Sequence, residues 1–137
     1  MIYAVIDTNV LVSAMLTHSK QSATFLVMEA MIANKIIPLF NEEIISEYEE
    51  VLHRAKFGFS EVDVSQYLEA LRQAGIHSQR IASSEYFPDS KDVVFYEVAL
   101  SKEDAYLVTG NKKHFPNKPI VVTPAEMVEI LQKEGVL

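Results

Sequence analysis

Two short apolar runs of this chain end in side chains that can bind a cation. The stretch IYAVIDTN places Asp7, Thr8 and Asn9 at the end of one run, and AYLVTGN places Thr109 and Asn111 at the end of another. Carboxylate, hydroxyl and amide oxygens are the ligands that hard cations such as Mg²⁺ and Mn²⁺ prefer in proteins. If both runs are neighbouring strands of one sheet, these side chains share an edge of the molecule.

Asp92 is a further acid that needs a partner. It begins the segment 92–100, in which apolar side chains face almost every direction and Glu97 is the only other charge. A helix of this kind is buried, so the Asp92 carboxylate needs compensation. The compensation comes either from the N–H groups of its own first turn or from a metal ion. Asp7 has a similar alternative, because Asp is a common N-cap.

A helix expected over residues 42–54 offers a third acid. Glu47 and Glu49 lie at the two borders of its apolar face, which consists of Ile44, Ile45, Tyr48, Val51 and Leu52. Periodicity cannot separate these two residues, and a border Glu is most often only solvated surface. Carboxylates held close together repel each other, and a shared cation turns that repulsion into binding.

Missing motifs and composition exclude several classes of protein. The chain has no cysteine, which excludes disulfides and thiolate metal sites and is compatible with a reducing cytosol. It has no Walker A, GxGxxG, GxSxG or HExxH pattern, which argues against P-loop, dinucleotide-binding, serine-hydrolase and zinc-hydrolase chemistry. No signal peptide and no apolar run of the ~18 residues that span a bilayer are present, so we expect a cytoplasmic protein without a membrane segment.

The net charge of −7 bears on the choice of partner. An acidic domain is a poor non-specific binder of nucleic acid, because such binding depends on Lys and Arg side chains that neutralise phosphates. That argument weakens if several carboxylates surround a divalent cation, because the cation then supplies the positive field. The position of the acids therefore matters more than their number.

Short apolar strands alternate with helices along the chain, which predicts an α/β fold in a single domain, residues 1–137. We expect a three-layer α/β/α arrangement with a mostly parallel, roughly five-stranded sheet, in which Pro38 marks an irregular or edge strand. Ligands bind beyond the carboxyl ends of the strands in such sheets. The expected strands are 2–6, 35–40, 76–82, 105–109 and 119–122, and the expected helices are 9–16, 22–35, 41–55, 60–75, 89–103 and 123–135.

Several segments together resemble the motifs of PIN domains. AVIDTNVLVSAML resembles the opening motif, EEIISEYEEVL the second, and SKDVVFYEVALSKEDAYLVTGNKKHFP the third and fourth. Each motif alone is weak, but four in the right order and spacing, over most of the chain, are specific. Within the family, the chain looks most like the bacterial and archaeal group related to VapC-type toxins of toxin–antitoxin systems.

The resemblance implies roles for individual residues. Asp7, Glu47 and Asp92 become the catalytic, metal-binding acids, and the Glu before the Tyr is chosen over Glu49. Asn111 matches a fourth position that is acidic in other PIN domains and is here a metal ligand without charge, so a second metal ion would lose a charged partner. Further residues match positions that orient the acids or contact the metal, namely Thr8, Asn9 and Thr109.

The activity implied by the resemblance is Mg²⁺- or Mn²⁺-dependent hydrolysis of RNA by an endoribonuclease. Such a protein would be a type II toxin neutralised by an antitoxin, and PIN relatives commonly form homodimers. Lys112, Lys113 and His114 are candidates for contacts with substrate phosphates, with a solvated loop as the alternative. Two other functions stay open. One is a catalytically weakened module that binds RNA or a protein partner. The other is a haloacid-dehalogenase-like phosphatase, which Asn9 disfavours because that family has a second acid there.

Overall fold

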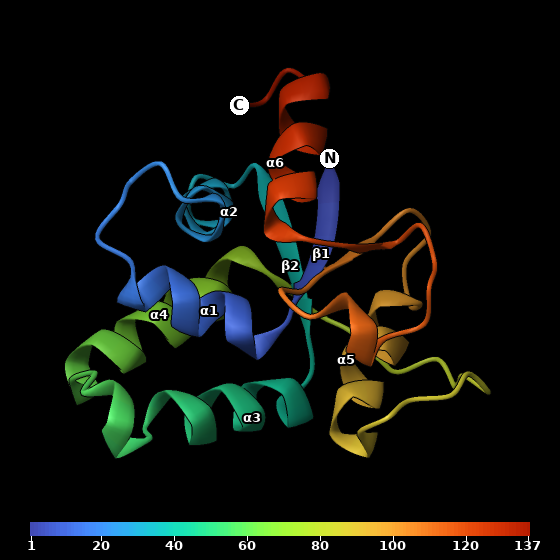
Figure 1. The fold of residues 1–137 in the computed structure, drawn as a ribbon, viewed down its shortest axis with the longest axis horizontal. Helices are drawn as coiled ribbons and strands as arrows, with labels where there is room; N and C mark the ends of the chain where they lie inside the picture. Colours follow the sequence, from blue (N-terminus) through green and yellow to red (C-terminus); the bar gives the residue numbers. More distant parts are fainter.

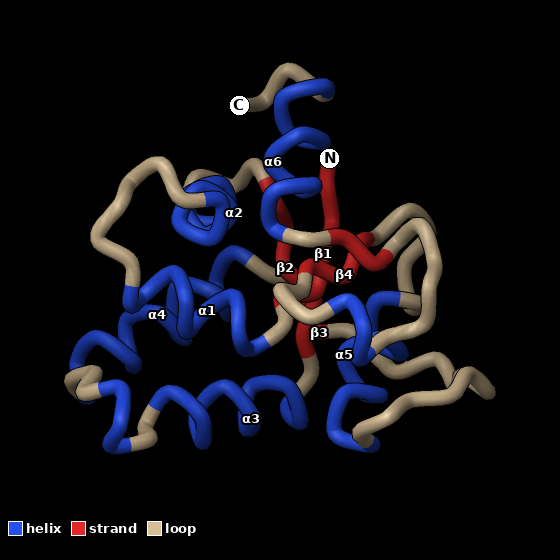
Figure 2. The backbone as a smooth tube through the Cα atoms, in the orientation of Figure 1, coloured by secondary structure: helices blue, strands red, loops and turns tan.

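The computed structural model describes residues 1–137, and its centre is a sheet of five strands in the order β3-β2-β1-β4-β5 (Figure 1, Figure 2). Every pair of neighbouring strands is parallel. The strands are β1 (Ile2–Ile6), β2 (Ile36–Phe40), β3 (Ile76–His77), β4 (Tyr106–Val108) and β5 (Val121–Val122). The expected α/β fold with a mostly parallel, five-stranded sheet is confirmed.

The fold has three layers, with the sheet between two layers of helices (Figure 1). In the view of Figure 1, α1, α2 and α4 lie on one side of the central strands and α5 lies on the other. No helix is long and apolar enough to cross a bilayer. The α-helices are α1 (Thr8–Leu16), α2 (Ala23–Ile32), α3 (Glu42–Leu52), α4 (Glu61–Ala74), α5 (Val93–Ala99) and α6 (Pro124–Lys133), and the short 3₁₀ helices are η1 (Ala55–Phe57), η2 (Ser90–Asp92) and η3 (Lys112–His114).

The helix starts follow the capping signals in the sequence. Asn41, Ser60 and Thr123 each accept a hydrogen bond from a backbone N–H of the first turn that follows. Thr123 and Glu126 form a reciprocal capping box with Pro124 at the first position of α6. These local bonds fix the start of each helix, and hence which of its side chains face the sheet.

The core contains 34 buried residues that come from all six helices and from every strand except β3. α5 contributes five of its seven residues to this core, and its only acidic residue, Glu97, is buried as well. The expectation that this helix is buried on nearly all sides is confirmed. It packs against β1, β2 and β4.

Most elements are shorter than expected, and two of them differ most from the prediction. The helix predicted over 89–103 is the 3₁₀ turn η2 followed by α5, which ends at Ala99, where the Ser101 hydroxyl donates to the Val98 carbonyl at 2.6 Å. The strand predicted over 76–82 ends at His77. The chain leaves the sheet there because the Arg80 side chain and the Ser83 N–H bind the carboxylate of Glu97 on α5.

Pro38 lies in an interior strand, which corrects the expectation of an edge. The Phe40 carbonyl accepts from the Ser78 N–H at 2.7 Å, so the backbone of Phe40 faces β3. Pro38, two residues earlier, faces the same side, but pairing with β3 begins only at Leu39 and Ile76. The missing N–H of Pro38 therefore costs no sheet hydrogen bond. Gly75 is required here, because a Cβ on it would lie 2.5 Å from the Pro38 carbonyl oxygen.

Candidate active site

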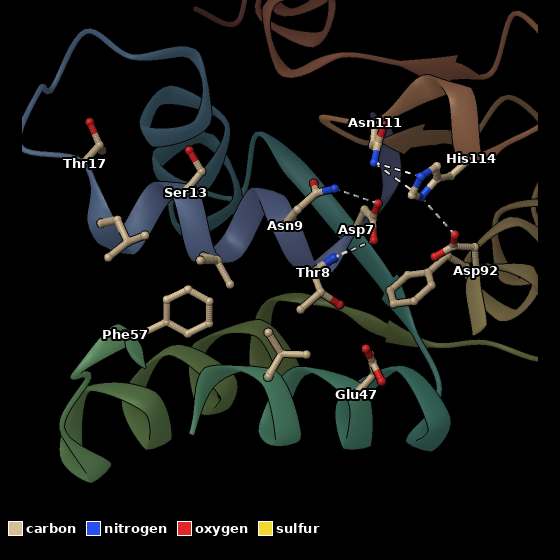
Figure 3. A pocket seen from close by; sticks show the side chains of 14 residues that line it. Asp7, Thr8, Asn9, Ser13, Thr17, Glu47, Phe57, Asp92, Asn111 and His114 are labelled. Atoms are coloured by element: carbon tan, nitrogen blue, oxygen red, sulfur yellow. Dashed lines mark hydrogen bonds and ion pairs between the residues drawn. The ribbon is translucent and has the colours of Figure 1, made fainter. Parts of the chain in front are cut away.

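A pocket of about 560 Å³ opens beyond the carboxyl end of β1. The strand order reverses at β1, which has β2 on one side and β4 on the other, and such reversals are where open parallel sheets bind ligands. Four side chains that the sequence singled out reach this pocket from different elements (Figure 3): Asp7 from the end of β1, Glu47 from α3, Asp92 from η2 and Asn111 from the loop after β4.

Asp7 is held in place on both of its carboxylate oxygens. Its Oδ1 accepts from the Thr8 N–H at 2.8 Å, and its Oδ2 accepts from the Thr109 hydroxyl at 2.7 Å and from the Asn9 amide at 3.2 Å. Asp7 is therefore the N-cap of α1 and also faces the pocket. Burial raises the pKa of Asp7, and the hydrogen bond from Thr109 opposes this rise.

The ends of β1 and β4 lie side by side. The Asp7 N–H donates to the Val108 carbonyl at 2.9 Å. The buried Thr109 hydroxyl, which donates to Asp7, accepts from the Asn111 N–H at 3.0 Å, and the Gly110 N–H donates to the Asn9 side-chain oxygen at 3.1 Å. Thr109 does not line the pocket but joins the β4 loop to the start of α1, so it orients Asp7 and Asn111 together.

Asp92 lacks the partners that Asp7 has. It makes no capping hydrogen bond to the first turn of α5, which removes the local explanation for its position. Its Oδ2 is buried without a hydrogen-bond partner, and the Nδ1 of the His114 ring lies 3.4 Å from it. Burial and, next, the charge of Asp7 raise the pKa of Asp92 to about 6. No Lys or Arg side chain pairs with Asp92, and His114 compensates its charge only when the imidazole is protonated.

Glu47 lines the pocket, whereas Glu49 is exposed and does not. The neighbouring residue explains the difference. Tyr48 is fully buried in the core, and its hydroxyl donates to the carbonyl of Ile6, the last residue of β1. This bond fixes the rotation of α3 against the central strand and turns Glu47 toward the end of β1, where Asp7 lies (Figure 3).

Of the three cationic residues that follow Asn111, only His114 reaches the pocket. Its ring lies between Asn111 and Asp92, with the Asn111 side-chain nitrogen 3.2 Å from Nε2 (Figure 3). Lys112 pairs with Glu126 on α6 at 3.2 Å, and Lys113 is exposed outside the pocket. The loop thus places one imidazole ring, rather than a cluster of three basic side chains, next to the acids.

The oxygen atoms of these side chains are the type of ligand that a hard divalent cation prefers. No three His, Asp or Glu side chains lie close enough together to hold a metal ion in this arrangement. The charges of both Asp7 and Glu47 nevertheless contribute to the raised pKa of Asp92, so the three acids share one electrostatic field. Carboxylate oxygens, one of them buried and unpartnered, are what Mg²⁺ or Mn²⁺ would require.

The sequence patterns did not single out the apolar half of this pocket. Its walls are Val12 and Leu16 of α1, Val51 of α3, Phe57 of η1 and Phe95 of α5. The signal was present in α1, where Thr8, Val12 and Leu16 recur every four residues and so share one face. The pocket therefore has an acidic end and an apolar end.

Comparison with known proteins adds the family. No curated protein and no solved structure matches the chain. A family model described as "PIN domain" matches residues 3–113, which span all of the site residues up to Asn111. PIN domains are generally nucleases that use divalent metal ions. Because the match covers most of its length, this chain belongs to the PIN domain family.

Proposed function

We propose that this protein is an endoribonuclease that hydrolyses RNA phosphodiester bonds with Mg²⁺ or Mn²⁺. The observation that carries the proposal is the convergence of Asp7, Glu47 and Asp92 on one pocket, because these acids come from three elements that are far apart in the sequence. In a member of a nuclease family, acids around a pocket at the carboxyl edge of the sheet are best explained by metal-dependent chemistry.

The surroundings of each residue suggest its role in the proposed reaction. Asp7 and Asp92 would hold the ion, and Glu47 would complete its shell or orient the attacking water. When bound, the ion supplies charge that polarises the phosphate and favours ionisation of a water. Thr109 and Asn9 keep Asp7 in its orientation, and Thr8 holds its other oxygen through the backbone. His114, the one basic side chain of its loop that reaches the pocket, would contact the substrate phosphate.

The proposed biological role is that of a cytoplasmic type II toxin neutralised by an antitoxin protein. The likeness of the TGNKKHFP segment to VapC-related PIN domains supports this role. The absence of cysteine is compatible with the reducing cytoplasm. Formation of a homodimer belongs to the same proposal.

A matched pair of variants on one helix tests the proposed activity. Glu47→Gln is expected to abolish Mn²⁺-dependent cleavage of RNA, whereas Glu49→Gln, two residues away and exposed, is expected to cleave as the wild type does. Asp7→Asn is expected to behave like Glu47→Gln. Equal cleavage rates for Asp7→Asn and the wild type would show that the nuclease site is elsewhere.

A second candidate function is a non-catalytic PIN module that binds RNA or a protein partner. Asn111 in place of an acid, and the absence of three acids close enough to hold a metal, favour this alternative. A thermal melt separates the two functions. A cation that binds the folded state must raise Tm, so the nuclease is expected to melt at a higher temperature with millimolar Mn²⁺, and the non-catalytic module at the same temperature with and without it.

A further inference from the structure

The active-site pocket extends well beyond the acids. One face of α1 runs along it, and Thr8 and Leu16 at the two ends of that face both line the pocket, as does Thr17 just after the helix. Eight residues of helix rise separate Thr8 from Leu16, about 12 Å. The acids lie at the Thr8 end, Leu16 is the last residue of α1, and Figure 3 shows Phe57 toward that other end. The pocket is therefore longer than a single phosphate group requires.

Phe57 presents an aromatic ring at the far end. Figure 3 shows this ring projecting into the space between α1 and α3. It is only half-buried, and Phe59 supports it in a stacked arrangement with a centroid separation of 5.6 Å and an interplanar angle of 15°. Leu16, which is 47% exposed, lines the same pocket from the last turn of α1. A planar group that enters between Leu16 and Phe57 would remove both from water.

The surroundings of the ring suit a nucleotide. The Lys56 ammonium lies 5.1 Å from the Phe57 centroid. The nearby cations are already paired, Arg54 with Glu50 and His53 with Glu61, but Lys56 is exposed and has no carboxylate partner, so it is free to contact a phosphate. The Thr17 hydroxyl accepts from the Ser19 N–H and can still donate to a base.

We propose that the Leu16–Phe57 end of the pocket is a nucleobase subsite, in which a base of single-stranded RNA stacks on Phe57 while its chain continues to the acids. This inference rests on the proposed function, because the acids place the scissile phosphate at the other end. Aromatic side chains bind single-stranded nucleic acid by stacking on its bases, with little dependence on sequence. The subsite thus selects single strands over duplexes, whose bases are already stacked.

A tryptophan reporter makes the stacking visible, since the chain has no Trp of its own. The Phe57→Trp variant, with Glu47→Gln added to prevent cleavage, is titrated in Mg²⁺ with a short single-stranded RNA of mixed sequence that carries a fluorescent label. Anisotropy of the label reports binding, and quenching of the tryptophan reports stacking. Quenching by the RNA, and none by inorganic polyphosphate, is expected. Tyr86→Trp is the control, because Tyr86 is 81% exposed outside the pocket.

Leucine separates stacking from simple packing. Phe57→Leu keeps an apolar side chain but removes the aromatic face, so it is expected to weaken RNA binding roughly 5- to 150-fold, as the loss of one stacked base does. Phe57→Tyr is expected to bind as the wild type does. Both variants are also melted with and without Mg²⁺, and an unchanged metal response shows that the acid end is intact.

The outcomes distinguish the subsite from the nuclease. RNA that binds the Phe57→Trp variant without quenching its tryptophan, or that binds Phe57→Leu and wild type equally, overturns the subsite even if the protein cleaves RNA, and leaves the apolar end to a protein partner. Quenching and a Phe57→Leu defect in a protein that never cleaves RNA support the subsite and refute the nuclease. A protein that neither binds nor cleaves the RNA overturns both.

Discussion

The carboxylates of Asp92, at the start of α5, and Glu97, near the end of the same helix, have opposite surroundings. The Glu97 side chain accepts from the Arg80 Nε and from the Ser83 N–H, each at 2.8 Å. Burial alone would raise the pKa of Glu97, but these two donors hold it below its ordinary value. Asp92 has a buried oxygen without a hydrogen-bond partner, and burial together with Asp7 raises its pKa to about 6.

The contrast separates a structural acid from a candidate functional one. Arg80 joins Glu97 on α5 to Glu43 on α3, at 2.8 and 2.9 Å. This network therefore holds together the helix that carries Glu47 and the helix that begins at Asp92. A satisfied carboxylate has nothing to gain from a ligand. An unsatisfied one gains from any cation that approaches, which is why the pocket end of α5 is where binding energy is available.

The largest expected effect is on the rate of RNA cleavage, which depends on Asp92 and not on Glu97 in the proposed function. Asp92→Asn should reduce Mn²⁺-dependent RNA cleavage more than about 100-fold, because even the loss of an outer partner of a metal ligand costs about 10- to 100-fold. Asp89→Asn is the matched control, because Asn also caps helices well and Asp89 is exposed. Single-turnover rates measure both. Near-wild-type cleavage by Asp92→Asn would remove Asp92 from the site.

The next effect is on stability and concerns Glu97. Glu97→Ala leaves the Arg80 Nε and the Ser83 N–H without their acceptor, and breaking a buried ion pair costs about 3–5 kcal/mol. Because the Arg80 side chain is 36% exposed and can be resolvated, we expect a loss of about 2–3 kcal/mol in the free energy of unfolding in urea.

Glu43→Ala is the control for the Glu97 variant. It removes only the outer arm of the network, where the Glu43 side chain is 59% exposed, so it should cost less than about 1 kcal/mol. Equal losses for the two variants would mean that the network has no buried centre and that Glu97 is no more structural than a surface acid.

Asp92 is expected to affect stability in the direction opposite to Glu97, because its charged form destabilises the folded state as pH rises. The pKa of Asp92 lies above its ordinary value of 3.8, so the folded state holds a proton that the unfolded state releases as pH rises from about 4 to about 6. Stability therefore falls across that interval, and the cost is complete above it. Asp92→Asn should raise Tm near pH 8 by a few degrees, about 1 kcal/mol after screening in an open pocket, and much less near pH 4. A lower Tm for Asp92→Asn near pH 8 would mean that the charged form is stabilised by the fold.

Sequence periodicity and capping signals were sufficient for most of the architecture. Asn41, Ser60 and Thr123 fixed helix starts, because an N-cap is a local interaction that a few neighbouring residues determine. The ends of helices and strands were harder to predict from the sequence. The strand after α4 ended early because Arg80 binds Glu97, seventeen residues away in the sequence, and no local pattern carries that information.

The site shows the same division between local and long-range information. Helical periodicity left Glu47 and Glu49 equivalent, and the family resemblance favoured Glu47, but the physical reason is the long-range bond from the Tyr48 hydroxyl to β1. Phe57 was not singled out, because aromatic residues in the short segment between two helices show no helical or strand periodicity. Its position in the pocket depends on how η1 packs against α1, which only the folded chain shows.

The smallest expected effect concerns Asn111, where a neutral amide faces the pocket beside Asp92. Asn111→Asp adds a charge to an already acidic site, so it should lower the Tm of the metal-free protein slightly and tighten Mg²⁺ binding by about 1 kcal/mol, roughly fivefold. Titration of Tm with Mg²⁺ measures both effects. Asn117→Asp is the control, because Asn117 is exposed, lies six residues further along the chain and does not line the pocket. If the two variants respond alike, net charge alone explains the change. If only Asn111→Asp tightens the ion, Asn111 faces the bound cation, and its neutrality limits how strongly the native site holds metal.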